Sequence, residues 1–111
     1  MIQLGEIKAH YEHAKKKHPL FAHRLAFGDA PTWERRVSKC QWIIENANAE
    51  RTTSVEDVLM EEVAELCLEL ARGDRQRIVA EALDVIAVCL RTIDVARGEQ
   101  QLGGPAEAAD A

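Results

Sequence analysis

Apolar side chains recur at steps of three and four residues along the chain, which is the period of a helix with one buried face. The first such segment covers 3–17, and a second begins near Thr32. Their apolar positions are Leu4, Ile7, Tyr11 and Ala14 in the first segment, and Trp33, Val37, Cys40, Ile44 and Ala47 in the second. The pattern predicts two amphipathic helices, separated by an irregular connection over 19–31.

Two further helices have recognisable start and stop signals. Ser54 stands three residues before Asp57, so its hydroxyl can accept a hydrogen bond from the Asp57 backbone N–H. Gly73 suits a left-handed helix end, Asp74 can cap the next helix, and Gly98 can end it. We therefore predict helices over 54–72 and 74–97, preceded by a loop over 46–53.

The composition agrees with one helical domain. The chain has 111 residues, of which 47% are hydrophobic and 30% charged, as in globular proteins. Aromatic residues make up only 5%, which disfavours an all-β sandwich. We expect an all-α domain over 1–98, built as a bundle of about four helices, and a disordered tail over 99–111, which lacks an apolar face.

Several classes of protein are disfavoured by the same data. The net charge of −5 argues against a nucleic-acid partner. The longest apolar run of the fourth helix, 85–90, is too short to span a membrane, and the first residues contain no apolar core of a secretory signal. The three cysteines, Cys40, Cys67 and Cys89, are an odd number among apolar neighbours. They predict buried, reduced thiols in a cytoplasmic protein.

The charge is distributed unevenly along the chain. Residues 1–45 carry a net charge of +3, whereas residues 46–111 carry −8. In the third helix, part of this excess falls on one stripe, which contains Glu62, Glu65 and Glu69 with Glu61 on its flank. Acidic stripes of this kind are commonly solvated surfaces, so this one alone does not identify a site.

The fourth helix makes the acidic stripe more informative. Between residues 78 and 93 it is apolar nearly all round, as is typical of a helix buried in a bundle or a subunit interface. Glu81 and Asp84 nevertheless share one face of it, and buried charges are usually paired or bound to a metal. A short turn at Gly73 would place this pair opposite Glu62 and Glu65 in an antiparallel hairpin.

Four carboxylates form an all-oxygen site, which favours hard cations such as Mg²⁺ or Mn²⁺. Di-iron sites in helical bundles add a Glu-x-x-His motif, and neither acidic pair here contains a histidine. Mg²⁺ often completes its coordination with substrate phosphates and can activate a bound water. The residues themselves thus indicate metal-assisted hydrolysis of a phosphoanhydride.

The same residues carry a family resemblance. Glu61-Glu62-Val63-Ala64-Glu65, fifteen residues, and then Glu81-Ala82-Leu83-Asp84 resemble the EExxE…ExxD signature of the MazG-like all-α nucleoside triphosphate pyrophosphohydrolases. That superfamily also includes dimeric dUTPases and phosphoribosyl-ATP pyrophosphohydrolase. The resemblance covers 54–97 well and extends loosely through the second helix and the Lys-Lys-His-Pro stretch at 16–19.

The resemblance implies specific roles. Glu62, Glu65, Glu81 and Asp84 match the metal ligands, and Glu61, Glu62 and Glu65 are the candidate catalytic carboxylates, one of them the general base. The reaction it implies splits a nucleoside triphosphate, in the presence of Mg²⁺, into the monophosphate and pyrophosphate. It also implies a homo-oligomer, a dimer or a tetramer, which would cover the apolar fourth helix.

The substrate's phosphates require cations, and three residues are candidates for binding them. Lys17 and His18 lie where small members of the family place a basic residue near the nucleotide, and Arg91 shares the stripe of Asp84. Two alternatives stay open: a non-catalytic helical interaction module, and an enzyme with the same fold acting on another phosphoanhydride, dUTPase-like or phosphoribosyl-nucleotide. The base and sugar preference is not encoded in any recognisable motif.

Overall fold

The computed structural model describes residues 2–21 and 28–99, and the regular elements in these ranges are all helices. They are α1 (Leu4–Lys17), α2 (Ala30–Glu50), α3 (Val55–Arg72) and α4 (Arg75–Ala96). The predicted all-α class is confirmed. The tail expected to be disordered lies, from residue 100 onward, outside the described residues.

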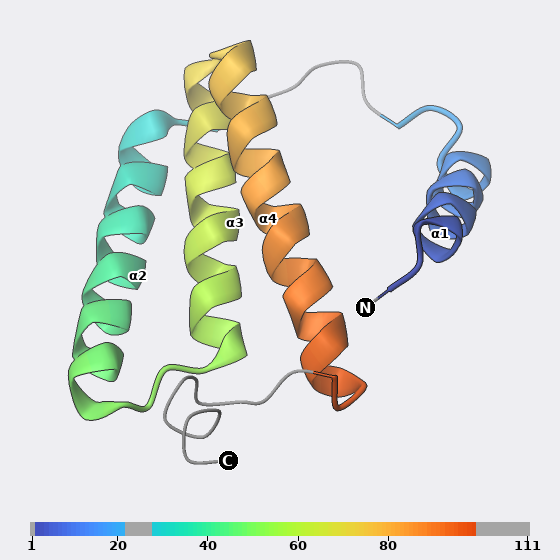
Figure 1. Cartoon of the computed structure of the whole chain (residues 1–111). Coiled ribbons are helices and arrows are strands. Elements are labelled where there is room, and N and C mark those ends of the chain that lie inside the picture. The colour runs from blue at the N-terminus through green and yellow to red at the C-terminus, as the bar shows by residue number, and fades with distance from the viewer. Residues whose placement is uncertain (1, 22–27, 100–111) are drawn as a thin grey trace.

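Three of the helices form a layer with α3 in the middle (Figure 1). Helix α3 packs against α2 on one side and α4 on the other, while the backbones of α2 and α4 stay apart. The small core lies between α2 and α3, where Val37 packs with Ala64 and Leu68. No residue of α4 is fully buried, and among the described helices this apolar helix packs only against α3.

Helix α1 stands apart from this layer, beyond α4 (Figure 1). Every residue from Ile7 to Phe21 is exposed, and the α1 backbone makes no close approach to the other helices. An ion pair ties α1 to the end of α4, with 2.8 Å between Arg97 Nη2 and Glu6 Oε2. The packed part of the chain is therefore a layer of three helices, and α1 does not complete a bundle with them.

Helix α2 is longer than predicted at both ends. It begins at Ala30, because Asp29 caps it by accepting a hydrogen bond from Thr32 N at 2.8 Å. Proline is favoured in the first turn of a helix, so Pro31 fits there. The predicted loop over 46–53 is wrong up to residue 50, since the helix continues to Glu50.

The end of α2 has a local explanation. The Asn46 side chain donates to the carbonyl of Trp42 at 2.8 Å, a bond within the helix rather than one that interrupts it. The helix ends at Arg51, which adopts a left-handed conformation with φ of 59°. A non-glycine residue in this region is uncommon, so the sequence offered no clear stop signal there.

The hairpin of α3 and α4 follows the predicted signals closely. Ser54 Oγ accepts from Asp57 N at 3.1 Å, and Asp57 Oδ2 accepts from Ser54 N at 3.3 Å, which completes a capping box. Gly73 ends α3 with φ of 78°, and Asp74 caps α4 by accepting from Arg77 N at 3.2 Å. These local bonds fix where each helix begins and therefore which residues face each other.

The cysteines depart in part from the prediction of buried thiols. All three are free; Cys40 and Cys67 are half-buried, but Cys89 is exposed. The prediction is wrong for Cys89, because among the described helices only α3 packs against α4 and it leaves this side chain exposed. In the described part of the chain, no helix combines the length and the apolar character that a membrane crossing requires.

The capping box gives a first testable prediction. Replacing Ser54 with Ala removes the hydroxyl that accepts from Asp57 N. We expect the free energy of unfolding to fall by about 1 kcal/mol, which lowers Tm by roughly 4–8 °C. Thermal unfolding followed by circular dichroism measures this. Ser38→Ala in the middle of α2 is the control and should leave Tm nearly unchanged; equal shifts would contradict the capping role.

Candidate metal centre

The short turn between α3 and α4 sets the register of their facing residues. Because the helices run antiparallel from Gly73, residues equally far from that glycine lie on opposite sides of the hairpin. Glu65 and Glu81 form one such pair, and Glu62 and Asp84 form the next. We call these two pairs the carboxylate rungs. Their spacing, three residues on each helix, keeps both rungs on one face.

The carboxylate rungs bring their side chains together in space. Oxygens of Glu62, Glu81 and Asp84 lie within 4.8 Å of one another, and so do oxygens of Glu61, Glu62 and Glu65. Glu62 belongs to both groups and links them. The structure thus assembles the five carboxylates predicted from the sequence into one cluster, while the metal itself stays a prediction.

Burial makes this cluster different from an ordinary acidic surface. Glu62 Oε2 and Glu81 Oε2 are both buried and have no hydrogen-bond partner. Burying a polar oxygen without a partner is costly, and more so when the group is charged. A divalent cation placed between the helices would satisfy both oxygens, so the residues present fit the group that the motif implies.

The pKa values of two carboxyls reflect the same crowding. Burial raises the pKa of Glu65 to about 7, with further contributions from the charges of Glu62, Glu81 and Glu61 and from a hydrogen bond with Glu81. Burial also raises the pKa of Glu62, and the charges of Asp84, Glu61 and Glu81 add to the effect. A bound cation would remove this penalty, because it favours the ionised form of each ligand.

The chemistry of the donor set is entirely that of carboxylate oxygen. The two groups of described residues that could hold a metal ion contain no histidine or cysteine. This donor set agrees with a hard cation and not with zinc or iron. Such a centre can bind phosphate oxygens through the cation and hold a water for attack. Which of these it does is not decided by the cluster alone.

The three predicted substrate-binding residues lie elsewhere. Lys17 ends α1 and His18 is its C-cap; both are exposed, and the structure gives neither a contact with the carboxylate cluster. Arg91 is exposed on α4, seven residues beyond Asp84 and on the same stripe. The structure therefore does not bring Lys17 and His18 to the cluster, and it leaves Arg91 about 10 Å along the helix from it.

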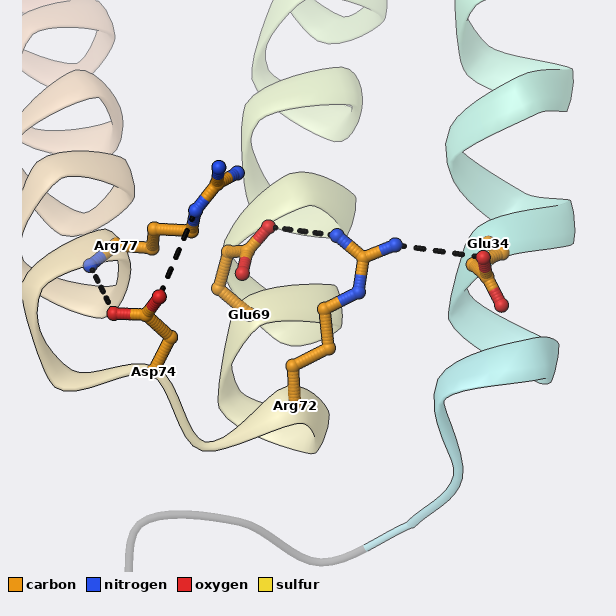
Figure 2. A network of polar contacts seen from close by, with 5 residues as sticks. All are labelled: Glu34, Glu69, Arg72, Asp74 and Arg77. Atoms are coloured by element: carbon orange, nitrogen blue, oxygen red, sulfur yellow. Dashed lines mark hydrogen bonds and ion pairs between the residues drawn. The ribbon is translucent and has the colours of Figure 1, made fainter.

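A second group of charged residues lies at the turn between α3 and α4 (Figure 2), and only the cap at Asp74 and the stripe position of Glu69 were predicted from the sequence. Glu69 is only 5% exposed, and its Oε2 accepts from Arg72 at 3.1 Å. Arg72 also reaches Glu34 on α2 at 3.4 Å. On α4, the Arg77 Nε lies 3.6 Å from Asp74 Oδ2. The helical period could have indicated Arg77 as well, since it precedes Glu81 by four residues.

Comparisons with known proteins add no further assignment. No family model matches this chain, and neither the curated proteins nor the solved structures contain a match. The case for its function therefore depends on the cluster and on the motif.

The raised pKa of Glu65 predicts an unusual dependence of stability on pH. The carboxyl ionises near 4.5 without its folded environment and near 7 within it, so the metal-free fold loses stability as pH rises from 4.5 to 7. Glu65→Gln removes this loss. At pH 8 without metal, we expect the variant to be more stable by about 1 kcal/mol after allowance for solvent access, or roughly 4–8 °C in Tm.

The measurement is thermal unfolding of wild type and Glu65→Gln at pH 5 and pH 8 in the presence of a chelator. The difference in Tm between the two proteins should become small at pH 5, where Glu65 is protonated in the folded state. The exposed Glu45 on α2 supplies the control, Glu45→Gln, which should behave like wild type at both values. A Glu65→Gln protein that is less stable than wild type at pH 8 would contradict the conclusion that burial and neighbouring charges disfavour the ionised Glu65.

Proposed function

We propose that this chain is a Mg²⁺-dependent nucleoside triphosphate pyrophosphohydrolase of the MazG-like kind, which converts a (deoxy)nucleoside triphosphate to the monophosphate and pyrophosphate. The observation that carries the proposal is the pair of carboxylate rungs, with buried oxygens of Glu62 and Glu81 left without partners. Their spacing in the sequence is that of the EExxE…ExxD signature. Such an enzyme would serve in control of the nucleotide pool.

In this proposal Glu62, Glu65, Glu81 and Asp84 hold Mg²⁺, and Mn²⁺ can substitute for it. When bound, the cation supplies a Lewis acid for phosphate oxygens and lowers the pKa of a coordinated water. Little rearrangement is needed, because oxygens of Glu62, Glu81 and Asp84 already lie within 4.8 Å of one another and Glu65 lies equally close to Glu62. The free-energy cost of bringing the ligands together is thus met when the protein folds, before a cation binds.

The remaining carboxylate of the motif is suited to proton transfer. Glu61 lies within 4.8 Å of Glu62 and Glu65 but does not belong to the group that includes α4. We assign it the role of general base, which accepts the proton of the attacking water at a carboxylate oxygen. Attack of this water at the α-phosphorus then breaks the bond from that phosphorus to the oxygen that bridges the α- and β-phosphates, and pyrophosphate leaves.

We also propose that the chain assembles with copies of itself into a dimer or a tetramer. Val79, Leu83 and Ile86 lie on one face of α4 and are each more than half exposed. Together with the absence of any fully buried residue in α4, this face supports a second layer supplied by another copy. A single layer of three helices buries little apolar surface, so a partner layer would add the missing stabilisation.

The test of the activity is a panel of nucleoside and deoxynucleoside triphosphates with Mg²⁺, in which pyrophosphate release is measured. We expect turnover of at least one substrate, and a loss of 100-fold or more, roughly, in kcat for Glu62→Gln and for Asp84→Asn, since each removes a ligand charge. Glu56→Gln on the exposed first turn of α3 is the matched control and should retain activity.

Two results would overturn the proposal. If neither Glu62→Gln nor Asp84→Asn reduces turnover, the cluster is not the active site. If the wild type hydrolyses no triphosphate and Mg²⁺ does not raise its Tm, the chain is better described as a helical interaction module. Release of pyrophosphate from dUTP alone, or from a phosphoribosyl-nucleotide alone, would instead assign the same chemistry to a narrower substrate.

The assembly has its own test. Leu83→Glu places a charge in the middle of the exposed apolar face of α4. We expect sedimentation equilibrium to show a dimer or tetramer for the wild type and a shift toward monomer for the variant, because the charge must be desolvated in the interface. A conservative Leu83→Met variant should keep the assembly. A monomeric wild type at micromolar concentration would contradict it.

A further inference from the structure

The facing pair next to the carboxylate rungs differs from them in charge. Counting from Gly73, Glu69 and Arg77 are equally distant from the turn, so they form the next pair after Glu65 and Glu81. Where the rungs have two carboxylates, this pair has one carboxylate and one guanidinium. A metal bound by the rungs therefore has an arginine beside it, on the side of the turn.

One oxygen of this pair's carboxylate is already engaged, while Glu69 Oε1 is buried without a hydrogen-bond partner among the described residues. Glu69 Oε2 accepts from Arg72 Nη1 at 3.1 Å, and Arg72 also reaches Glu34 at 3.4 Å. Arg72 thus has two acidic partners and bridges α2 and α3. Its main effect is to hold Glu69 and to join the two helices, so it is a poor candidate for binding a substrate.

Arg77 is differently placed. Its side chain is 68% exposed, and within the described part of the chain its ion-pair partner is Asp74, whose Oδ2 lies 3.6 Å from Nε. Figure 2 shows its two terminal nitrogens pointing away from Asp74 and from the turn, in front of the space between α3 and α4. Asp74 caps α4 through the Arg77 backbone and also contacts the side chain, so one carboxylate positions the arginine while leaving its terminal nitrogens available.

The distances along α4 favour Arg77 over the other cations. Arg77 precedes Glu81 by four positions. The two residues are therefore about 6 Å apart along the helix axis, within the reach of an arginine side chain. Arg91 is about 10 Å beyond Asp84, and the pair between them, Val58 and Val88, is apolar. Among the described residues of α4, Arg77 is thus the cation next to the carboxylate rungs.

We propose that Arg77 binds the β- and γ-phosphates of the substrate and thereby selects triphosphates over diphosphates. The inference rests on the proposed function and adds to it the orientation of the substrate's phosphate chain along the hairpin. The α-phosphate lies at the carboxylate rungs, the pyrophosphate portion extends toward the turn, and the nucleoside extends toward Arg91. A guanidinium suits this role because its terminal nitrogens can bind two phosphate oxygens at once.

The test uses inorganic pyrophosphate, which carries the recognised group without the nucleoside. Isothermal titration calorimetry in Mg²⁺ measures its affinity for the wild type, Arg77→Ala, Arg77→Lys and Arg75→Ala. We expect Arg77→Ala to weaken binding about 10- to 100-fold, as for loss of a charged hydrogen bond, and Arg77→Lys to restore part of it. Arg75→Ala removes an exposed arginine from the same turn of α4 and should bind like wild type.

A second readout compares kcat/KM for a nucleoside triphosphate with that for the corresponding diphosphate. Arg77→Ala should lower the ratio by at least about fivefold, while the Tm increase produced by Mg²⁺ alone stays at its wild-type value. Equal pyrophosphate affinities for Arg77→Ala and Arg75→Ala would overturn the inference even if the enzyme is active. Absence of any Mg²⁺ effect and of turnover in the wild type would instead overturn the proposed function.

Discussion

The repulsion among the carboxylates between α3 and α4 is the constraint on which the rest of this structure depends. Bringing acidic side chains from two helices within 4.8 Å of one another, with buried oxygens of Glu62 and Glu81 unpartnered, works against folding. The capping box at Ser54, the left-handed Gly73 and the cap at Asp74 hold the hairpin in this arrangement. The hairpin is therefore stabilised by its caps and destabilised by the charges between its helices.

The core contributes to the site only indirectly. Val37, Ala64 and Leu68 hold α2 against α3, and Arg72 adds a polar link between the same two helices through Glu34 and Glu69. Helix α4 carries two of the five carboxylates of the cluster, and among the described helices it packs only against α3. The geometry of the site therefore depends on the contact between α3 and α4.

Local signals made the hairpin predictable from the sequence. Ser54, Gly73 and Asp74 act through bonds to nearby residues, and the helical period then places Glu62, Glu65, Glu81 and Asp84 on facing stripes. The extension of α2 to Glu50 was not predictable in the same way, because Asn46 is compatible with both a turn and a helix-internal bond. Its choice depends on packing against α3, which the local sequence does not encode.

The failures at long range have a common physical cause. The exposure of Cys89 and the separation of α1 from the layer depend on which surfaces meet, not on the period of any one helix. Glu69 was on the predicted acidic stripe but was not distinguished from solvated charges, and Arg77 was not predicted to lie near the cluster. Burial of Glu69 to 5% exposure and the orientation of Arg77 became visible only with the partner residues Arg72 and Asp74 in place.

The shortness of the connection between α3 and α4 has a consequence for how this site can change. A residue inserted between Gly73 and Asp74 would turn the face of α4 by about 100° if its contact with α3 were kept, and would move Glu81 and Asp84 away from their partners. The length of this turn sets how the faces of α3 and α4 are rotated relative to each other. It therefore constrains the geometry of the cluster as strongly as the identity of the carboxylates does.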